Sequence, residues 1–384
     1  MRIEKLNIYK ISLPFTGDFS ISRLTGASSN IIVVEAIADQ GEIKGYGEAV
    51  PVEFITGETQ ESTARSVGFF AQKRSFPWEL DDVSQIWDFV DTLPRGKEHN
   101  AAICASEMAL LDALGKGQRR SIIHYFPHKF FTAKIYYGAT IPLSNKQRTI
   151  ELCKFAGNLG LTNLRIKMGK DFEQNRDAME AVRSVFGDEC DIRVDPNGAW
   201  DRDLAFKHMP MIRKYKVKVV EQPMISANPA FGEFAEALSS KGVSLMACES
   251  APTLNHVKDI IKQGFYDIIN IKLSRCGGFR RSFGIIDHVR KNGLSFQIGC
   301  QIGESGILSA AGRVLCLLCR DARYYDGSYG SFLLKKNVTL EDVSFGPCGE
   351  AGPQEGPGLG VEVSRRSLEN LRNDGSPVIT VLRP

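Results

Sequence analysis

Hydrophobic and polar residues alternate along roughly the first 50 positions of the chain, and turn residues separate the runs. A period of two is typical of strands with one buried face, so the pattern predicts a meander of antiparallel strands. Polar loops are expected at residues 16–28 and 51–58. A helical period then covers residues 101–114 and stops at Gly115. Residues 1–130 are therefore predicted to form an α+β domain.

From about residue 134 the pattern changes to short β-branched runs that alternate with longer helical stretches. Successive runs end roughly 23 to 28 residues apart, the length of one strand, one helix and two short loops. A closed parallel barrel is therefore expected. An open doubly wound sheet would carry a glycine-rich phosphate loop after its first strand, and residues 138–142 are not such a loop. The predicted strands cover residues 134–140, 163–167, 191–195, 217–221, 243–249, 267–272, 294–299 and 322–326.

The barrel pattern places the remaining residues at the two ends of the chain. We expect the barrel to occupy residues 131–350. Residues 351–384 are rich in loops, and runs at 361–363 and 378–382 are predicted to be strands that return to the N-terminal domain.

Charge, hydropathy and cysteine content argue against several classes of binding partner. A formal net charge of +3 is too small to indicate nucleic acid or an anionic membrane. No stretch approaches the roughly 20 apolar residues of a membrane span, and the first residues lead into an alternating strand instead of an apolar signal core. A cytoplasmic location is expected by default. The nine cysteines are scattered, as reduced thiols are, and the Cys316–Cys319 pair has no second pair nearby, so zinc is not expected.

Ionisable residues stand at or just past the C-terminal ends of five successive predicted strands. In a parallel barrel these ends meet on one face, where catalytic residues gather. Because strand side chains alternate, Arg165 shares the interior face of its strand with Lys167, and Asn270 shares that of its strand with Lys272. One acid at a strand end is usually a helix cap or an ion-pair partner, but five ionisable residues at consecutive strand ends indicate a site. The five are Lys167, Asp195, Glu221, Glu249 and Lys272.

The three acids of this set can hold one hard cation through oxygen ligands. Mg²⁺, which Mn²⁺ can replace, binds few protein carboxylates and leaves positions for a substrate carboxylate. The metal would stabilise the negative charge that appears when the α-proton of that substrate leaves. A lysine beside a divalent cation and a second cation has its charged form disfavoured and can act as a base, and Arg165 is placed to do this to Lys167.

The segments that carry these residues resemble motifs of the enolase superfamily, in particular of its muconate lactonizing enzyme and mandelate racemase groups. The superfamily uses a lysine or histidine base with Mg²⁺. The resemblance covers nearly the whole chain. The matching segments are residues 164–169, 193–200, 220–223, 246–250, 270–272 with 277–278, 106–112 and 357–360.

The resemblance implies an α/β fold, a modified (β/α)8 barrel of TIM type with (β/α)7β topology, and an α+β capping domain built from both chain ends. It implies Lys167 and Lys272 as the acid/base pair on opposite faces of the α-carbon, and Asp195, Glu221 and Glu249 as metal ligands. A small-molecule carboxylate is the expected partner, and a homo-oligomer is expected.

Two positions depart from the family pattern. Arg165 stands where lysine is usual; it stays cationic but cannot shuttle a proton. Cys248 stands where the muconate group often has its ligand aspartate, so the third ligand is open between Glu249 and a water-bridged or sulfur contact. For Mg²⁺ we favour Glu249, because thiolate is too soft a ligand.

Residues expected to support the site or contact substrate lie on neighbouring loops. The resemblance implies that the two N-terminal loops and residues 301–305 and 326–329 close over the substrate. Dipeptide epimerases of the family carry two aspartates one residue apart on the last strand, whereas this chain has Asp326-Gly-Ser328, which weakens recognition of a substrate ammonium. Glu304 is either a substrate contact, a supporting acid or a helix N-terminal charge. The full set is Arg165, Asn197, Asn270, Cys300, Glu304 and Asp326.

A lysine on each face predicts 1,1-proton transfer through an enolate. The expected reaction is racemisation or epimerisation of an amino-acid derivative or dipeptide. The alternative in the same site is muconate-type cycloisomerisation, or dehydration by β-elimination, in which one lysine only steadies the enolate. A metal-independent Schiff-base lyase using Lys272 and a non-catalytic binding protein are the minor alternatives.

Overall fold

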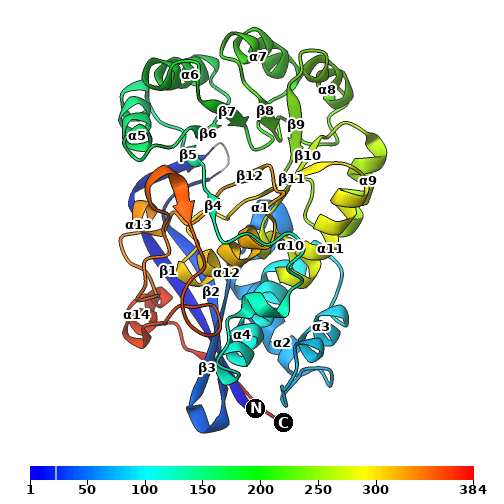
Figure 1. Ribbon diagram of the computed structural model, residues 1–384, viewed down its shortest axis with the longest axis vertical. Helices are drawn as coiled ribbons and strands as arrows, with labels where there is room; N and C mark the ends of the chain where they lie inside the picture. Colours follow the sequence, from blue (N-terminus) through cyan, green and yellow to red (C-terminus); the bar gives the residue numbers. More distant parts are fainter. Residues whose placement is uncertain (22–23) are drawn as a thin grey trace.

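The computed structural model describes residues 1–21 and 24–384. An N-terminal antiparallel sheet with helices packs against a curled parallel sheet that helices surround, and the two termini lie near each other at the end of the molecule away from the parallel sheet (Figure 1). We call the first body, with the C-terminal strand that joins it, the cap, and the second the barrel. No helix in the described part of the chain is long and apolar enough to cross a membrane.

The cap sheet confirms the antiparallel meander and the return of the chain end. Its strand order is β14-β1-β2-β3, with β14 (Ile379–Leu382) antiparallel to β1. The predicted strand at residues 361–363 is only an isolated bridge between Thr339 and Val363. The other cap strands are β1 (Ile3–Ile21), β2 (Leu24–Ala38) and β3 (Ile43–Ala49).

The polar loop expected at residues 16–28 is wrong as a loop. Strands β1 and β2 continue through it as a paired hairpin, with Pro14 opposite Ser28 and Phe19 opposite Gly26. Backbone pairing does not need apolar side chains, so a polar sequence did not prevent the ladder. Residues 22–23 of that predicted loop lie outside the described residues. The loop at residues 51–58 contains one helical turn, α1 (Glu53–Thr56).

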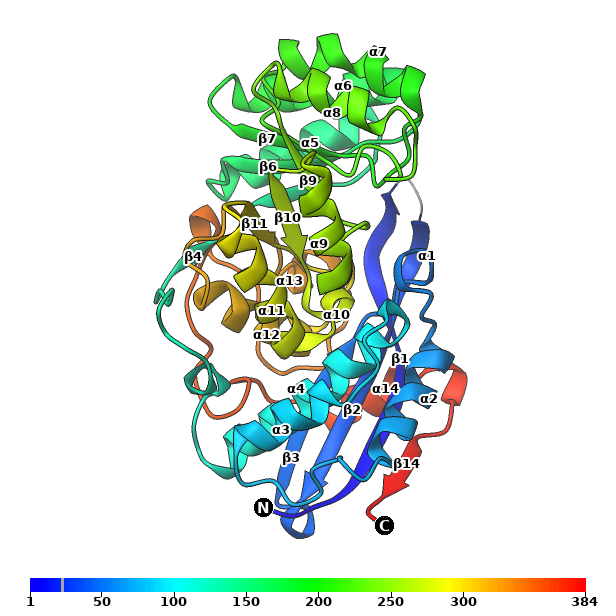
Figure 2. The same cartoon turned by 90° about the vertical axis from the view of Figure 1, so that its right-hand side faces the viewer.

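Helix α4 (Asn100–Gly117) lies between the cap sheet and the barrel helices (Figure 2). It approaches β3 so closely that a Cβ at Gly45 would lie 2.3 Å from the Ala109 carbonyl oxygen, and one at Gly47 would lie 2.0 Å from that of Ala105. Only glycine permits this contact. The other cap helices are α2 (Gln60–Ala71), α3 (Val83–Asp91) and α14 (Arg365–Asn370).

Eight strands form one parallel sheet in the order β12-β11-β10-β9-β8-β7-β6-β5. Helices connect each strand to the next. After β12 the barrel helix is replaced by the four-residue helix α13 (Gly330–Leu333). This is the expected (β/α)7β topology. The strands are β5 (Ala139–Ile141), β6 (Asn163–Lys167), β7 (Asp191–Asp195), β8 (Val219–Glu221), β9 (Ser244–Ala247), β10 (Ile268–Ile271), β11 (Ser295–Ile298) and β12 (Tyr324–Tyr325).

Closure of the sheet is less complete than the repeat predicted. Strands β5 and β12 are the two edges of the ladder and do not pair. A backbone hydrogen bond of 2.9 Å from Gly138 to Tyr325 joins the chain before β5 to β12. The short edge strands leave room for a second small sheet, β4 (Ile135–Tyr136) with β13 (Glu350–Ala351). The barrel helices are α5 (Lys146–Asn158), α6 (Phe172–Phe186), α7 (Arg202–Lys214), α8 (Phe231–Ser239), α9 (Leu254–Gln263), α10 (Leu273–Cys276), α11 (Gly278–Lys291) and α12 (Gly306–Leu317).

Buried acids of the cap fasten it to the barrel. Glu48 of β3 accepts hydrogen bonds from the backbone of Ser305 and Leu308 at the start of α12. Glu107 of α4 accepts from the backbone of Phe279 and Arg280 at the start of α11. Unpaired N–H groups at a helix N-terminus attract carboxylates. We call these contacts the cap–barrel interface.

Candidate active site

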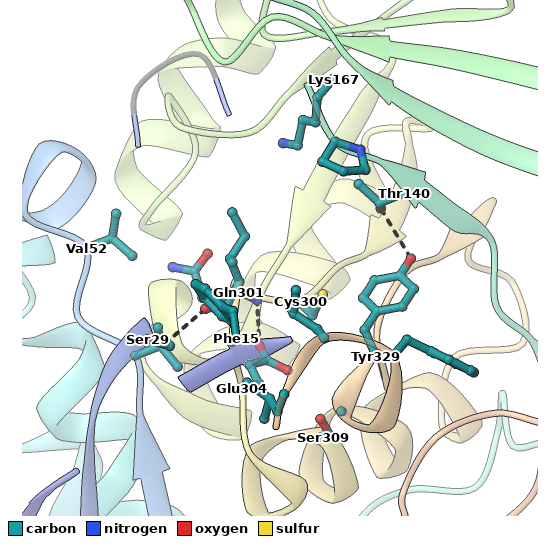
Figure 3. A pocket seen from close by; sticks show the side chains of 18 of the residues that line it. Phe15, Ser29, Val52, Thr140, Lys167, Cys300, Gln301, Glu304, Ser309 and Tyr329 are labelled. Carbon is teal, nitrogen blue, oxygen red and sulfur yellow. Dashed lines mark hydrogen bonds between the residues drawn. The ribbon is translucent and has the colours of Figure 1, made fainter. Parts of the chain in front are cut away.

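A cavity of about 960 Å³ lies between the cap and the C-terminal ends of the barrel strands. It is lined by cap residues such as Phe15 and Val52 and by barrel residues such as Lys167 and Tyr329 (Figure 3). Of the predicted site residues, the structure brings these to the cavity wall: Arg165, Lys167, Asn197, Glu249, Lys272, Cys300 and Glu304.

Lys167 ends strand β6 and points its amine towards the acids of the next strand. Its Nζ lies 2.5 Å from Asp195 Oδ2 and 3.0 Å from Asn197 Oδ1. The Asn197 amide also donates to Asp195 Oδ2 at 3.3 Å and to Glu249 Oε1 at 2.8 Å. Asn197 therefore links the lysine to two of the acids, and its positive φ of 51° turns the chain sharply enough to do so.

Arg165, two residues before Lys167 on the same face of β6, is buried beside the acids. Its Nη1 is 3.4 Å from Glu221 Oε2 and 3.8 Å from Asp195 Oδ2. The other oxygen of Glu221 accepts a 2.8 Å hydrogen bond from the Asn270 amide. Both predicted supporting residues thus contact a predicted metal ligand.

Glu249, rather than Cys248, faces the cavity. Cys248 is fully buried, and its sulfur accepts a 2.8 Å hydrogen bond from Arg275 Nη1. The loop is held by Gln222, whose side-chain oxygen accepts from the backbone of Cys248 and of Ser250. Glu249 lines the cavity and Cys248 is not among its described lining residues, which favours Glu249 over the sulfur as the third acid.

Asp326 is not among the described residues that line the large cavity, so of its two predicted roles, support of the site or contact with substrate, the structure favours support. Its oxygens lie 2.9 and 3.0 Å from the guanidinium of Arg193, and Arg165 Nε is 3.3 Å away. Arg165, Arg193, Glu221 and Asp326 are all buried, and we call them the barrel network. Asp326 supports the site by fixing these arginines.

Lys272 follows strand β10 and reaches the cavity from the other side of the acids. Only 7% of its surface is exposed. In the part of the chain that the structure describes, its amine has no hydrogen bond or ion pair, in contrast to Lys167. Burial acts to lower the pKa of Lys272, but the neighbouring Cys248 thiol and Glu221 carboxylate outweigh it, and the pKa is raised.

The acids influence one another's ionisation. Burial and the Glu221 carboxylate raise the pKa of Asp195 to about 6, and Glu249 adds to this rise while Lys167 opposes it. Burial would also raise the pKa of Glu221, but the positive charges of Arg165 and Lys167 outweigh it and lower that pKa. The three acids are therefore close enough to repel one another.

The oxygen donors of the site suit a hard cation, although the three carboxylates do not point at one common position. Among the described residues no group of three or more His, Cys, Asp or Glu side chains is arranged around a metal position. Lys167, Arg165 and Asn270 occupy carboxylate oxygens instead. However, Glu249 Oε2 is buried without a hydrogen-bond partner. A buried, unpaired carboxylate oxygen beside two mutually repelling acids is what a divalent cation would satisfy.

Several residues that build the site were not predicted. Arg275 and Gln222 act by holding Cys248 and its loop, and Thr140 forms a 3.2 Å hydrogen bond on the cavity wall with Tyr329, which lies in the predicted segment 326–329. Thr140 also accepts from Arg165 at 3.1 Å. Their position next to the strand ends was the only signal in the sequence, and many other polar residues share it.

The chain belongs to the family described as enolase C-terminal domain-like. The family model matches residues 149–367, more than half of the chain, and spans strands β6 to β12. This confirms the resemblance to the enolase superfamily.

Two curated relatives are similar over most of their length. The chain is 27% identical over 318 residues to a hydrophobic dipeptide epimerase from Enterococcus faecalis, covering 81% of this chain and 86% of the relative. It is 24% identical over 374 residues to an N-succinyl-L-Arg/Lys racemase from Bacillus cereus, covering 97% and 98%.

Solved structures share the fold. The N-succinyl Arg/Lys racemase from Bacillus cereus superposes with a TM-score of 0.85 at 23% identity over 99% of this chain and 100% of that one. The Enterococcus faecalis dipeptide epimerase, complexed with Mg and L-Leu-L-Tyr, gives 0.80 at 24% over 94% and 100%. A 2-chloromuconate cycloisomerase from Rhodococcus opacus gives 0.84 at 23% over 97% and 100%. Since isomerases of different reactions superpose equally well, the fold alone does not choose between them.

Proposed function

We propose that this protein is a Mg²⁺-dependent racemase or epimerase that moves the α-proton of an amino-acid derivative or dipeptide. One observation carries the proposal. In the sheet order β6-β7-β8-β9-β10, the strands that lead to Asp195, Glu221 and Glu249 lie between those that lead to Lys167 and Lys272. Both lysines and Glu249 line one cavity, and Asp195 and Glu221 are buried next to it. An amine on each side of the acids suits removal of a proton from one face and its return to the other.

In this proposal Asp195, Glu221 and Glu249 would hold the metal. When bound, Mg²⁺ would stabilise the charge developing on the substrate carboxylate and lower the pKa of the amines beside it. The hydrogen bonds of Lys167 to Asp195 and Asn197 would aim its amine at the α-carbon. Arg165 would keep the acids ionised beneath the substrate, because it is cationic at any working pH.

The curated relatives support racemisation or epimerisation over cycloisomerisation. Those described above are named as a dipeptide epimerase and an N-succinyl amino-acid racemase. A Schiff base at Lys272 is not favoured, because the acids beside it suit a metal and have no part in that chemistry.

Proton NMR in heavy water tests the proposal. The protein with Mg²⁺ is incubated with N-acyl amino acids, dipeptides, hydroxyproline derivatives and sugar acids. We expect deuterium at the α-carbon with inversion, and loss of this exchange when a chelator removes the metal. Ring closure or loss of water would favour the cycloisomerase or dehydratase alternative. Intact Mg²⁺ affinity without exchange on any acid would indicate a binding protein.

Three expectations from the sequence stay predictions. They are the homo-oligomeric state, the cytoplasmic location and the domain boundaries at residues 130/131 and 350/351. Light scattering of the purified protein tests the first, and we expect a mass that is a multiple of the 42.5 kDa chain.

A further inference from the structure

A second cavity, of about 710 Å³, lies at the junction of cap and barrel and shares no described lining residue with the candidate active site. Helix α3 and the start of α4 line it from the cap, and α9 and α11 line it from the barrel. Helix α11 packs against both α4 and α9 (Figures 1 and 2). The volume is within the range of roughly 300–1,000 Å³ that is usual for small-molecule sites. We call this cavity the side cavity.

Positive side chains outnumber negative ones on the wall of the side cavity. Six arginines and lysines line it against two aspartates, a formal charge of +4 where the whole chain has +3, so the rest of the chain is close to neutral. The two aspartates are already paired: Asp91 lies 2.7 Å from Arg280, and Asp287 lies 3.3 Å from Arg290. In the part of the chain that the structure describes, the other four cations of the wall form no ion pair: Arg95, Lys129, Lys258 and Arg281.

Arg281 is the least exposed of these four cations. Its guanidinium donates to the Asn100 side-chain oxygen at 3.1 Å and to two backbone carbonyls between α3 and α4, all of them uncharged acceptors. Burial lowers the pKa of Arg281; the charges of Glu107 and Asp91 oppose this, and Arg95 adds to it. A bound anion would match the positive charge that these contacts leave uncompensated.

Aromatic rings form a continuous surface beside the cations. The ring centroids of Trp87 and Phe126 are 5.6 Å apart, and those of Phe126 and Phe283 are 5.3 Å apart. The guanidinium of Arg290 lies 4.0 Å from the centroid of the Phe130 ring. Trp87, Phe283 and Phe130 are only half-buried. Aromatic rings and stacked guanidinium groups bind planar rings such as nucleobases by stacking.

The two features together define the chemistry of a ligand. Guanidinium groups bind phosphate through parallel hydrogen bonds, and lysines attract it as point charges. A single carboxylate can match only part of the positive charge, whereas a di- or triphosphate group can contact several of the unpaired cations at once. The aromatic surface suits a planar ring carried by the same molecule.

The side cavity also adjoins the segment that follows Lys272. Helix α10 begins directly after Lys272 and ends on the wall of the cavity. Asn100, which accepts from Arg281, donates to the backbone carbonyl of Arg275 at 2.6 Å and to that of Pro252 at 2.9 Å. A ligand that fixes Arg281 therefore also restrains Asn100 and the backbone of α10 that Asn100 holds.

We propose that the side cavity binds a small ligand with several negative charges and a planar ring, of the class of nucleoside di- and triphosphates, and that the bound ligand restrains the segment after Lys272 through Arg281 and Asn100. The phosphates contact the unpaired cations, and the ring stacks on the aromatic surface. The binding site does not depend on the reaction proposed above, because it shares no described residue with that cavity.

Calorimetric titration of the full chain tests the class of ligand. The probes are ADP, adenosine and inorganic pyrophosphate, used without Mg²⁺ and with a chelator, so that no metal can bring phosphate to the candidate active site. We expect ADP to bind at least about tenfold more tightly than either of the other two, since both stacking and charge contribute. No binding of ADP overturns the proposal. Equal affinity for ADP and pyrophosphate contradicts the role of the aromatic surface.

Charge reversals locate the site. Lys258→Glu should weaken ADP binding at least about tenfold, because a like charge then faces the phosphates. Lys241→Glu makes the same change of net charge at an exposed position that does not line the side cavity, and should leave the affinity within about twofold. Loss of ADP binding in Lys167→Ala with wild-type binding in Lys258→Glu would place the nucleotide in the candidate active site and overturn the proposal. A dimer that Lys258→Glu dissociates, with no binding of ADP, would assign the surface to a second copy of the chain instead.

Hydrogen exchange of the backbone tests the connection to Lys272. Saturating ADP should slow amide exchange at residues 93–100, beside the side cavity, and at residues 272–277, and neither segment should change in Lys258→Glu at the same ADP concentration. Slower exchange at residues 93–100 alone would contradict the restraint through Asn100. Unchanged exchange in both segments, with ADP bound, would place the ligand elsewhere and overturn the whole inference.

Discussion

The pKa values of buried acids shift downwards in the barrel network and upwards at the cap–barrel interface. In the barrel network burial alone would raise the pKa of Asp326, but Arg193 and Arg165 outweigh it and the pKa is lowered. At the cap–barrel interface burial raises the pKa of Glu48 to about 7 and that of Glu107 to about 8, because backbone N–H groups oppose the rise only in part. A neighbouring positive charge offsets the rise in carboxyl pKa that burial causes, whereas the N–H groups of a helix N-terminus offset only part of that rise.

The difference assigns separate roles to the two regions. The barrel network keeps its charges across the working pH range, so the acids beneath the substrate remain ionised. The cap–barrel interface, by contrast, gains charge near neutral pH, where its buried acids lose protons. The buried charges of the barrel network are thus matched in pairs, whereas the cap is held to the barrel by contacts that depend on pH.

Replacing either of the two lysines beside the barrel network should have the largest effect, because each is proposed to move the proton. Lys167→Ala and Lys272→Ala should each lower the rate of isomerisation by at least the roughly 10²- to 10⁴-fold that a general acid or base contributes. Mg²⁺ affinity, measured by calorimetry, should stay nearly unchanged, because neither lysine is a ligand in the proposal. Full turnover in either variant would remove it from the acid/base pair.

Removing the compensating acid of the barrel network should be strongly destabilising. Asp326→Asn leaves Arg193 and Arg165 buried with an incomplete partner, which should lower the free energy of unfolding by about 3–5 kcal/mol in urea titrations. Asp188→Asn is the control: it breaks an exposed pair with Lys216 and should change stability by less than about 1 kcal/mol. Similar values for the two variants would contradict the importance of the network.

Replacing an acid of the proposed metal set should weaken metal binding. Glu221→Gln removes one negative charge and should reduce Mg²⁺ affinity by at least roughly 10- to 100-fold, the range typical of losing a partner of a metal ligand. Calorimetric titration of the folded variant measures this. An unchanged titration would remove Glu221 from the ligands.

The last expected effect, which is small for each pH unit, concerns pH at the cap–barrel interface. The pKa of Glu107 is about 8 in the folded state against an ordinary 4.5, so its contribution to stability is fully present below pH 4.5 and is lost as pH rises through 8. The loss amounts to at most about 1.4 kcal/mol per pH unit. Glu107→Gln keeps one acceptor oxygen for the two backbone N–H groups and cannot ionise, so the variant should be less stable overall, but its unfolding free energy should vary less between pH 5 and pH 8. Equal slopes for the two proteins would show that Glu107 does not titrate in this range.

The sequence predicted the strand ends well because two periodicities overlap there. Alternation within each strand put Arg165 and Lys167 on the same face, and the strand repeat placed Asp195 and Glu221 on successive strands. The structure has these residues adjacent as expected. Their roles as bases and ligands stay predictions.

Features that depend on contacts distant in sequence were not predicted. The contact of Arg275 depends on the direction of the Cys248 side chain, and Asp326 is buried because arginines from two other strands surround it. The hairpin at residues 16–28 was missed because backbone pairing, rather than side-chain polarity, decides it. The open edge between β5 and β12 reflects strand lengths that periodicity does not define.

The most direct test of the two-lysine account follows α-proton exchange in heavy water from each enantiomer separately. With the substrate identified by the screen, Lys167→Ala and Lys272→Ala should each still exchange the proton of one enantiomer, and the two variants should prefer opposite ones, because one base remains on each face. Neither variant should interconvert the enantiomers. If both variants exchanged the same enantiomer, or if either racemised the substrate at the wild-type rate, the two lysines would not lie on opposite faces of the reacting carbon and the account would be wrong.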